Sequence, residues 1–478
     1  MSDLPRLMHH FEPKKGWIND PNGLCFFGGK YHAFFQHYPF KAKWGPMHWG
    51  HCKTKDFVKW EQLPCALAPD TDYDGQGCFS GSAVEHEGKH ILMYTSVREL
   101  ETEDGARVIR QTQSIAVGDG LNYTKIQQNP VITADVLPEG SSSIDFRDPR
   151  IWKEGNTFYS CIGSRNADDS GQIALFSSGD TETWKWEGII DRCNNRYGKM
   201  WECPDFYPMG DKYVLMFSPM GVGEHTSVYL VGDFDYQTGR FSHYISGEVD
   251  WGFDYYAPQS FLAPDGRRII IGWANEWEWM PLWKDWGPTY KEGWCGFFNI
   301  PREVRMMENG TLQFLPVAET EILRQDPICQ DMFVVTEAET ELKAGDGVAF
   351  ELKMKIDLEE TDADMLELIL RSGEGKKTVC LFDFKNAQMS VDRNASDGWS
   401  RGVSRSTMFL KGKKELDIHI LSDQSSLEIF ANEYQDNHAN NIFAGNAQNR
   451  ILIRTYGGRA VIREYESYGM KDCFRGND

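Results

Sequence analysis

The chain has 478 residues, of which 41% are hydrophobic and 25% charged, as is ordinary for a globular protein in water. This length exceeds what one small core organises, so we expect two domains. The formal net charge of −21 argues against nucleic acids and anionic membrane surfaces as partners, because both attract basic patches.

The N-terminal residues show no signal peptide, because Met1–Phe11 contains charges and a proline instead of an apolar stretch. No apolar run approaches the length of a membrane span. Eleven cysteines without CxxC pairs favour reduced thiols in a cytoplasmic protein over a disulfide framework or a zinc site. The histidines lack ligand spacings such as HExxH, so we predict no metal and no other cofactor. They cluster at His9, His10, His37, His48 and His51.

A weak repeat organises the first 320 residues. Five times, a run of strand-forming residues leads into a turn and a second such run, which is a hairpin signal. The turns recur about every 55–67 residues, which is room for four short strands per repeat. We therefore predict a five-bladed β-propeller, with a generic β-sandwich as the alternative on periodicity alone. The predicted hairpins are Leu24–Phe35, Ala83–Tyr94, Ile151–Cys161, Phe206–Phe217 and Ser260–Gly272.

The character of the chain changes after Pro316. Residues 319–335 are predicted as a linker or short helix, followed by short alternating strands that indicate an antiparallel β-sandwich. The predicted organisation is all-β, with a propeller in residues 1–318, the linker, and a sandwich in residues 336–478. The predicted sandwich strands are Val348–Ile356, Met365–Leu370, Thr378–Phe384, Ala387–Val391, Glu415–Leu421, Ser426–Phe430, Ile451–Tyr456 and Val461–Tyr465.

Acidic motifs stand directly before three of the five hairpins. In a propeller, equivalent positions on the innermost strands surround the central channel, so residues distant in sequence meet in one pocket. Two carboxylates that flank one bond can hydrolyse a glycoside. The five segments are Asp20-Pro21, Ser80-Gly81-Ser82, Asp148-Pro149, Glu202-Cys203-Pro204 and Tyr256-Ala257-Pro258.

Asp20 is the candidate nucleophile, because Asn19 and Asn22 offer amide donors that keep a carboxylate ionised. Glu202 is the candidate general acid and base, in an apolar setting that includes Trp201 and Phe206. The structural alternatives are a plain turn at Asp20 and a surface glutamate at Glu202.

Asp148 is the third candidate and could hold two vicinal hydroxyls. Its neighbour Arg147 could fix Asp148 or Glu202 by charge-assisted hydrogen bonds. A structural ion pair is the alternative, and Asp145 competes with Asp148 on spacing. Gln36, at the end of a predicted strand, is a plausible hydroxyl ligand, while Trp17 is as easily a packing residue as a platform for a sugar.

The ordered motifs resemble glycoside hydrolase family 32, which includes invertases, β-fructofuranosidases and sucrose-6-phosphate hydrolases. The resemblance runs from about residue 10 to residue 305, and the ordered set is specific although each motif alone is weak. The matching segments are His10-Phe11-Glu12-Pro13, Trp17-Ile18-Asn19-Asp20-Pro21-Asn22-Gly23, Trp44–His51, Phe79-Ser80-Gly81-Ser82, Arg147-Asp148-Pro149, Glu202-Cys203-Pro204, Asp254–Gln259, Gly293–Gly296 and Pro301-Arg302-Glu303.

The resemblance implies a five-bladed propeller followed by a β-sandwich. It also implies Asp20 as nucleophile, Glu202 as acid/base and Asp148 as stabiliser of the transition state. The fructose-binding residues that it implies are Asn19, Gln36, Trp44, Phe79, Ser80, Arg147 and Trp273.

We therefore predict a retaining glycosidase of invertase type in sucrose metabolism, which releases terminal β-D-fructofuranosyl units from sucrose or related short fructosides. A fructosyltransferase with the same residues and a non-catalytic carbohydrate-binding protein are the alternatives. The leaving group stays open between sucrose, sucrose 6-phosphate, fructo-oligosaccharides and inulin. A homo-oligomer in which the sandwich contacts a second copy is one option.

Overall fold

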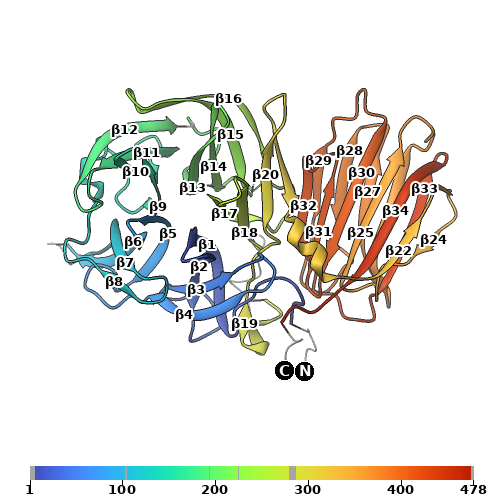
Figure 1. Ribbon diagram of the computed structural model, residues 1–478, viewed down its shortest axis with the longest axis horizontal. Helices are drawn as coiled ribbons and strands as arrows, with labels where there is room; N and C mark the ends of the chain where they lie inside the picture. Colours follow the sequence, from blue (N-terminus) through green and yellow to red (C-terminus); the bar gives the residue numbers. More distant parts are fainter. Residues whose placement is uncertain (1–5, 103–104, 193, 224–225, 279–286, 475–478) are drawn as a thin grey trace.

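The structure is a computed structural model that describes residues 6–102, 105–192, 194–223, 226–278 and 287–474. Strands dominate, in an N-terminal β-propeller and a C-terminal β-sandwich that lie side by side (Figure 1). Only short 3-10 helices interrupt the strands in the described part of the chain: η1 (Ala134–Val136), η3 (Tyr290–Glu292) and η4 (Ala318–Leu323). Among the same residues, no helix is long and apolar enough to cross a membrane.

The propeller consists of successive antiparallel sheets of four strands around a common centre. The first contains β1 (Gly16–Phe27), β2 (Lys30–Tyr38), β3 (His48–Thr54) and β4 (Glu61–Leu67). The second contains β5 (Gly77–His86), β6 (Lys89–Glu101), β7 (Arg107–Gly118) and β8 (Tyr123–Lys125). The third contains β9 (Phe146–Glu154), β10 (Thr157–Arg165), β11 (Gly171–Ser178) and β12 (Trp184–Arg192).

Two further sheets complete this part of the molecule. One contains β13 (Met200–Met209), β14 (Lys212–Met220), β15 (Val228–Asp235) and β16 (Arg240–Glu248). The other contains β17 (Tyr256–Leu262), β18 (Arg268–Trp273), β20 (Arg302–Met306) and β21 (Leu312–Pro316). Each predicted hairpin is confirmed as the first strand pair of one sheet.

The ring closes through the first strands of the sheets. β1, β5, β9, β13 and β17 each contact their two neighbours, so these strands line the centre. The short strand β19 (Trp294–Cys295), which follows β18 in sequence, pairs in parallel with β1 and joins the last sheet to the first. Residues about 280 positions apart are thereby fixed beside one another, as a closed ring requires.

The sandwich packs two sheets over one apolar core. One sheet contains β22 (Arg324–Gln330), β34 (Ala460–Met470), β25 (Phe350–Asp357), β30 (Glu415–Ser422), β31 (Ser426–Ala431) and β32 (Asp436–Asn441), with β23 (Phe333–Val335) also on β34. The other contains β24 (Thr340–Leu342), β33 (Arg450–Tyr456), β26 (Met365–Gly373), β27 (Lys376–Asp383), β28 (Gln388–Asp392) and β29 (Val403–Thr407).

The eight predicted sandwich strands correspond to observed strands, but the predicted linker was too long. Within residues 319–335, η4 covers the first part, and β22 and β23 then pair with β34 in a sandwich sheet. Exposed residues dominate β22, so its side chains carry little of the apolar pattern by which a strand is predicted.

Candidate active site

A bulge before each hairpin turns side chains toward the centre of the ring. The strand register shifts between Ile18 and Pro21 in β1 and between Glu202 and Asp205 in β13, and similar shifts occur in β5, β9 and β17. Bulges next to active sites commonly re-aim a side chain. Three bulge residues that are not glycine have positive φ, namely Asp148 (66°), Cys203 (49°) and Ala257 (50°). The five segments predicted to converge thus all contain an interruption of the strand ladder.

A cavity of about 740 Å³ lies beside the bulges of the first strands. It is lined by nine of the ten site residues predicted from the sequence, which are Asn19, Asp20, Gln36, Trp44, Phe79, Ser80, Arg147, Asp148 and Glu202. The tenth, Trp273, is fully buried and does not line the cavity, so the expectation of direct sugar contact needs correction. Trp273 instead packs edge-on against Trp17 and Tyr256 and contacts Trp277, because its strand end faces this aromatic layer.

Asp20 is held by donors on both carboxylate oxygens. The Ser80 hydroxyl donates to Oδ2 (2.6 Å) and the Asn19 amide donates to Oδ1 (2.9 Å). Trp17 Nε1 donates in turn to Asn19 Oδ1 (2.7 Å), which fixes the amide orientation. Trp17 is fully buried, so it is a packing residue and not a platform for a sugar.

Burial and hydrogen bonding act in opposite directions on the pKa of Asp20. Burial, and then the negative charge of Glu202, raise the pKa of the Asp20 carboxyl. Hydrogen bonds from Ser80, Asn19 and the Cys203 thiol oppose this rise, since they stabilise the ionised form. The Cys203 Sγ lies 3.4 Å from Asp20 Oδ2.

Asp148 lies beside the same thiol. Its Oδ2 accepts a hydrogen bond from the Cys203 backbone N–H (2.9 Å), and its own N–H donates to Thr95 Oγ1 (2.8 Å). Burial and the charges of Glu202 and Asp20 raise the pKa of Asp148 to about 7, against the opposing charge of Arg147. The competing candidate Asp145 does not line the cavity and pairs with Arg147 (2.8 Å).

Glu202 is oriented by two donors from neighbouring sheets. Arg147 Nη2 donates to Oε1 (2.8 Å), and the Tyr256 hydroxyl donates to Oε2 (2.5 Å). Sequence reasoning named Arg147 for such a contact but missed Tyr256 as a site residue. The signal for Tyr256 was present, because Tyr256-Ala257-Pro258 occupies the equivalent position of the fifth hairpin.

Other lining residues that sequence reasoning missed lie within a strand, at strand ends and in loops. Lys199 precedes β13, Gln111 lies in β7, and Met220 ends β14. Glu276, Trp277 and Glu278 follow the end of β18. No local pattern marks these positions, since their approach to the cavity depends on how the sheets pack.

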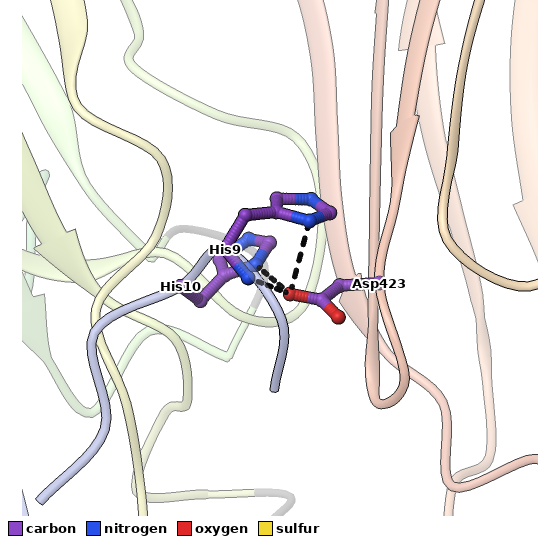
Figure 2. A group of neighbouring side chains, drawn as sticks. All are labelled: His9, His10 and Asp423. Carbon is purple, nitrogen blue, oxygen red and sulfur yellow. Dashed lines mark hydrogen bonds and ion pairs between the residues drawn. The ribbon is translucent and has the colours of Figure 1, made fainter. Parts of the chain in front are cut away.

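A separate cluster of potential metal ligands lies where the N-terminal segment meets the sandwich (Figure 2). Asp423 Oδ2 accepts hydrogen bonds from the backbone N–H groups of Met8 (3.1 Å) and His9 (3.0 Å) and lies 2.8 Å from His10 Nδ1. His10 Nε2 faces Glu428 Oε1 at 3.2 Å.

Both ring nitrogens of His10 therefore face carboxylates. Burial lowers the pKa of His10, but the hydrogen bonds to Asp423 and Glu428 outweigh it and raise the pKa to about 9. An imidazolium has no lone pair for a metal ion. The cluster is best interpreted as an ionic contact between the propeller and the sandwich.

Carboxylates from separate sheets of the ring meet in one cavity. This arrangement is typical of the active site of a glycoside hydrolase. The model of the glycosyl hydrolases family 32 N-terminal domain matches residues 10–316, and that of the glycosyl hydrolases family 32 C terminal matches residues 319–468. The chain belongs to glycoside hydrolase family 32.

Curated relatives agree with this assignment over nearly their whole length. A sucrose-6-phosphate hydrolase of Zymomonas mobilis is 35% identical, with 97% of this chain and 92% of the relative covered. A raffinose invertase of Escherichia coli is 35% identical, with 95% and 93% covered.

Solved structures are similar in fold as well. The sucrose-6-phosphate hydrolase of Lactobacillus gasseri has a TM-score of 0.84 at 28% identity, covering 99% of this chain and 94% of the other. A mutant β-fructofuranosidase of Bombyx mori in complex with sucrose has a TM-score of 0.81 at 29% identity, covering 98% and 94%.

Proposed function

We propose that this protein is a retaining β-fructofuranosidase that releases terminal β-D-fructofuranosyl units from sucrose or related short fructosides. The observation that carries the proposal is the meeting of Asp20, Asp148 and Glu202, from three separate sheets, in one cavity. Two acids with different surroundings supply the nucleophile and the proton donor that glycoside hydrolysis needs.

In the first step, Asp20 attacks the anomeric C2 of the fructosyl unit and the bond from C2 to the glycosidic oxygen breaks. Glu202 gives its proton to the departing oxygen, so the leaving sugar departs neutral. Glu202 then takes a proton from water, which attacks C2, releases fructose and frees Asp20. Asp148 binds fructose hydroxyls, where its hydrogen bonds strengthen in the transition state.

The remaining lining residues bind and orient the substrate in this proposal. Asn19 and Ser80 hold Asp20, and Arg147 with Tyr256 holds Glu202. Gln36, Trp44 and Phe79 contact the sugar from the cavity wall. Trp273 supports Trp17 and Trp277 from behind, which places it in a positioning role.

Finer features of the architecture belong to the same proposal. We count each of the successive four-stranded sheets as one blade, which makes a five-bladed propeller. Its boundary with the sandwich lies near residue 318, between the two matched family segments. The cytoplasmic location and a homo-oligomer with contacts through the sandwich stay predictions.

The test is replacement of the two reacting carboxylates. Asp20→Ala and Glu202→Ala should each lower kcat for fructose release from sucrose by about a thousandfold or more, because each removes a reacting group. Circular dichroism should show an unchanged fold. Glu182→Ala, in an exposed turn before β12, serves as control and should keep full activity. Turnover near the wild-type rate in either active-site variant would reject the mechanism.

Product analysis at high sucrose separates hydrolysis from transfer. A hydrolase releases free fructose and glucose in equal amounts, whereas a fructosyltransferase releases glucose and lengthens sucrose. Predominance of fructo-oligosaccharides over free fructose would favour the transferase.

A further inference from the structure

The three bulge residues with positive φ donate their backbone N–H groups to side chains of the preceding sheet. Asp148 donates to Thr95 Oγ1 (2.8 Å), Cys203 to Asp148 Oδ2 (2.9 Å) and Ala257 to Ser218 Oγ (2.8 Å). A non-glycine residue keeps such a backbone conformation only where its surroundings fix it. These acceptors therefore hold the bulges that carry active-site side chains.

Thr95 holds the bulge of the third sheet. The register of β9 against β10 shifts between Arg147 and Arg150, so Asp148 has no partner residue on β10. Asp148 is buried, and a buried backbone N–H needs an acceptor. Thr95 Oγ1, on β6 of the second sheet, supplies that acceptor in place of the strand ladder.

The Thr95 hydroxyl is itself oriented by hydrogen bonds. It has one proton and two acceptors for it, Gln113 Oε1 (2.9 Å) and the Ser80 backbone oxygen (3.1 Å). The Gln113 amide donates to the Phe146 backbone oxygen (2.9 Å), which turns Oε1 toward Thr95. The hydroxyl oxygen thereby keeps a lone pair for the Asp148 N–H.

This hydroxyl lies between the supports of two active-site carboxylates. Ser80, whose backbone oxygen faces Thr95, donates its own hydroxyl to Asp20. Thr95 thus contacts the residue that holds Asp20 and the backbone of Asp148. Thr95 and Gln113 are fully buried and do not line the cavity, so neither can touch a substrate.

We propose that Thr95 is a positioning residue, which fixes the carboxylate of Asp148 relative to Asp20. The proposal rests on the proposed fructosidase function, in which Asp148 binds fructose hydroxyls in the transition state. Without the Thr95 hydroxyl, the Asp148 N–H loses its acceptor and the bulge relaxes. A carboxylate displaced by a fraction of an ångström slows the chemical step more than it weakens substrate binding.

The first measurement removes the hydroxyl while keeping the side-chain shape. Thr95→Val should lower kcat for fructose release from sucrose by about tenfold to a hundredfold, with KM changed by less than about threefold. Thr95→Ala tests the same loss with a smaller side chain, should the valine variant fail to fold. Thr95→Ser keeps the hydroxyl and should retain kcat within about threefold of wild type. An unchanged kcat in a folded Thr95→Val or Thr95→Ala would overturn the proposal.

The matched control loses an equally buried threonine hydroxyl in the sandwich. Thr378 on β27 is fully buried, and its hydroxyl lies 2.7 Å from that of Ser396. Thr378→Val should lower the Tm as Thr95→Val does but leave kcat at the wild-type value. An equal loss of kcat in both variants would reduce the role of Thr95 to general stability and refute positioning.

A double-mutant cycle tests whether Thr95 acts through Asp148. Adding Thr95→Val to Asp148→Asn should lower kcat by less than about threefold, because the carboxylate that Thr95 positions is already gone. A loss as large as that of Thr95→Val in the wild-type background would show that Thr95 acts by another route.

Wild-type protein separates this inference from the proposed function. Release of fructose by wild type, together with an unchanged kcat in Thr95→Val, would refute the positioning role and leave the fructosidase function standing. Absence of release by wild type from sucrose, sucrose 6-phosphate and raffinose would remove the function, and the role of Thr95 with it.

Discussion

Single residues in this site act through the ionisation state of their neighbours. Ser80 and Asn19 both donate to Asp20, and their bonds favour the ionised carboxylate that a nucleophile needs. Burial acts in the opposite direction and raises the pKa of Asp20. The balance between burial and these hydrogen bonds sets the pKa of Asp20. Below that pH the carboxylate is protonated and can no longer act as the nucleophile.

Removing the Ser80 hydroxyl should shift that balance. Ser80→Ala takes away a hydrogen bond to the ionised form, so the pKa of Asp20 rises further and activity is lost at a higher pH as the solution is acidified. We expect the acid limb of kcat/KM for sucrose to move upward and kcat/KM near neutral pH to fall about tenfold.

The control for this shift is another hydrogen bond from a serine to a carboxylate. Ser177 on β11 donates to Glu187 on β12 (2.6 Å), and neither residue lines the cavity, so Ser177→Ala should leave the pH profile unchanged. An acid limb that stays in place in Ser80→Ala would show that Ser80 does not tune the nucleophile.

At the scale of elements, the bulged first strands explain both the convergence and the sequence motifs. Proline follows the bulge residue in four of these strands, where the missing N–H suits an interrupted ladder. The fifth bulge, in β5, has Gly81 in the corresponding segment. A Cβ there would lie 2.0 Å from the Met93 backbone oxygen and 2.7 Å from the Tyr94 Cα.

Gly81→Ala should therefore disrupt the second sheet. Because the conflicting atoms are backbone atoms of β6, the strands must separate, and we expect a loss of about 3 kcal/mol in the free energy of unfolding, with insoluble expression as the extreme. Gly179→Ala is the control, since a Cβ at Gly179 has no atom within 4 Å and should change stability by less than about 0.5 kcal/mol. Equal denaturation midpoints for the two variants would contradict this account of the bulge.

At the scale of the whole molecule, buried ions join the two domains. Arg302 of the propeller donates to Asp250 (2.7 Å) and to Glu428 of the sandwich (2.6 Å), and Glu428 also faces His10. Removing one member of such a network leaves another charge buried and unpaired, which is strongly destabilising. The N-terminal segment thereby connects the first sheet of the propeller to the sandwich.

This network predicts a loss of stability at alkaline pH. The pKa of His10 is raised from 6.5 to about 9, so its contribution is fully present below pH 6.5 and is lost as the pH rises through about 9. The groups that face His10 are Asp423, Glu428 and His9. A pKa shift from 6.5 to about 9 corresponds to a contribution of about 3 kcal/mol.

The measurement is the Tm between pH 7 and pH 9.5. Wild-type protein should lose Tm over this range, while His10→Gln should start lower and change less, because it lacks the titrating group. His243→Gln removes a half-buried partner of Asp191 (2.7 Å) and should retain the wild-type slope. Parallel curves for wild type and His10→Gln would exclude His10 as the source.

Much of the architecture was predictable because its determinants are local. Turn residues and alternating apolar residues specify hairpins within about a dozen positions, so all five propeller hairpins and eight sandwich strands were recognised. The sandwich strands that were missed are β22, β23, β24, β29 and β32. β22 is largely exposed, so it lacks an apolar pattern. β32 consists mainly of buried polar residues that contact the propeller; for example, the Trp251 backbone N–H donates to the backbone oxygen of Asn437.

The order of the acidic motifs and the period of the hairpins are properties of the chain, and together they predict that Asp20, Asp148 and Glu202 lie in one pocket. Only the packing of the sheets determined that Trp273 lies buried among aromatic side chains and that Lys199, Glu276 and Glu278 line the cavity. Strand patterns depend on neighbours a few residues away, whereas a loop takes its place from contacts with sheets that are distant in sequence.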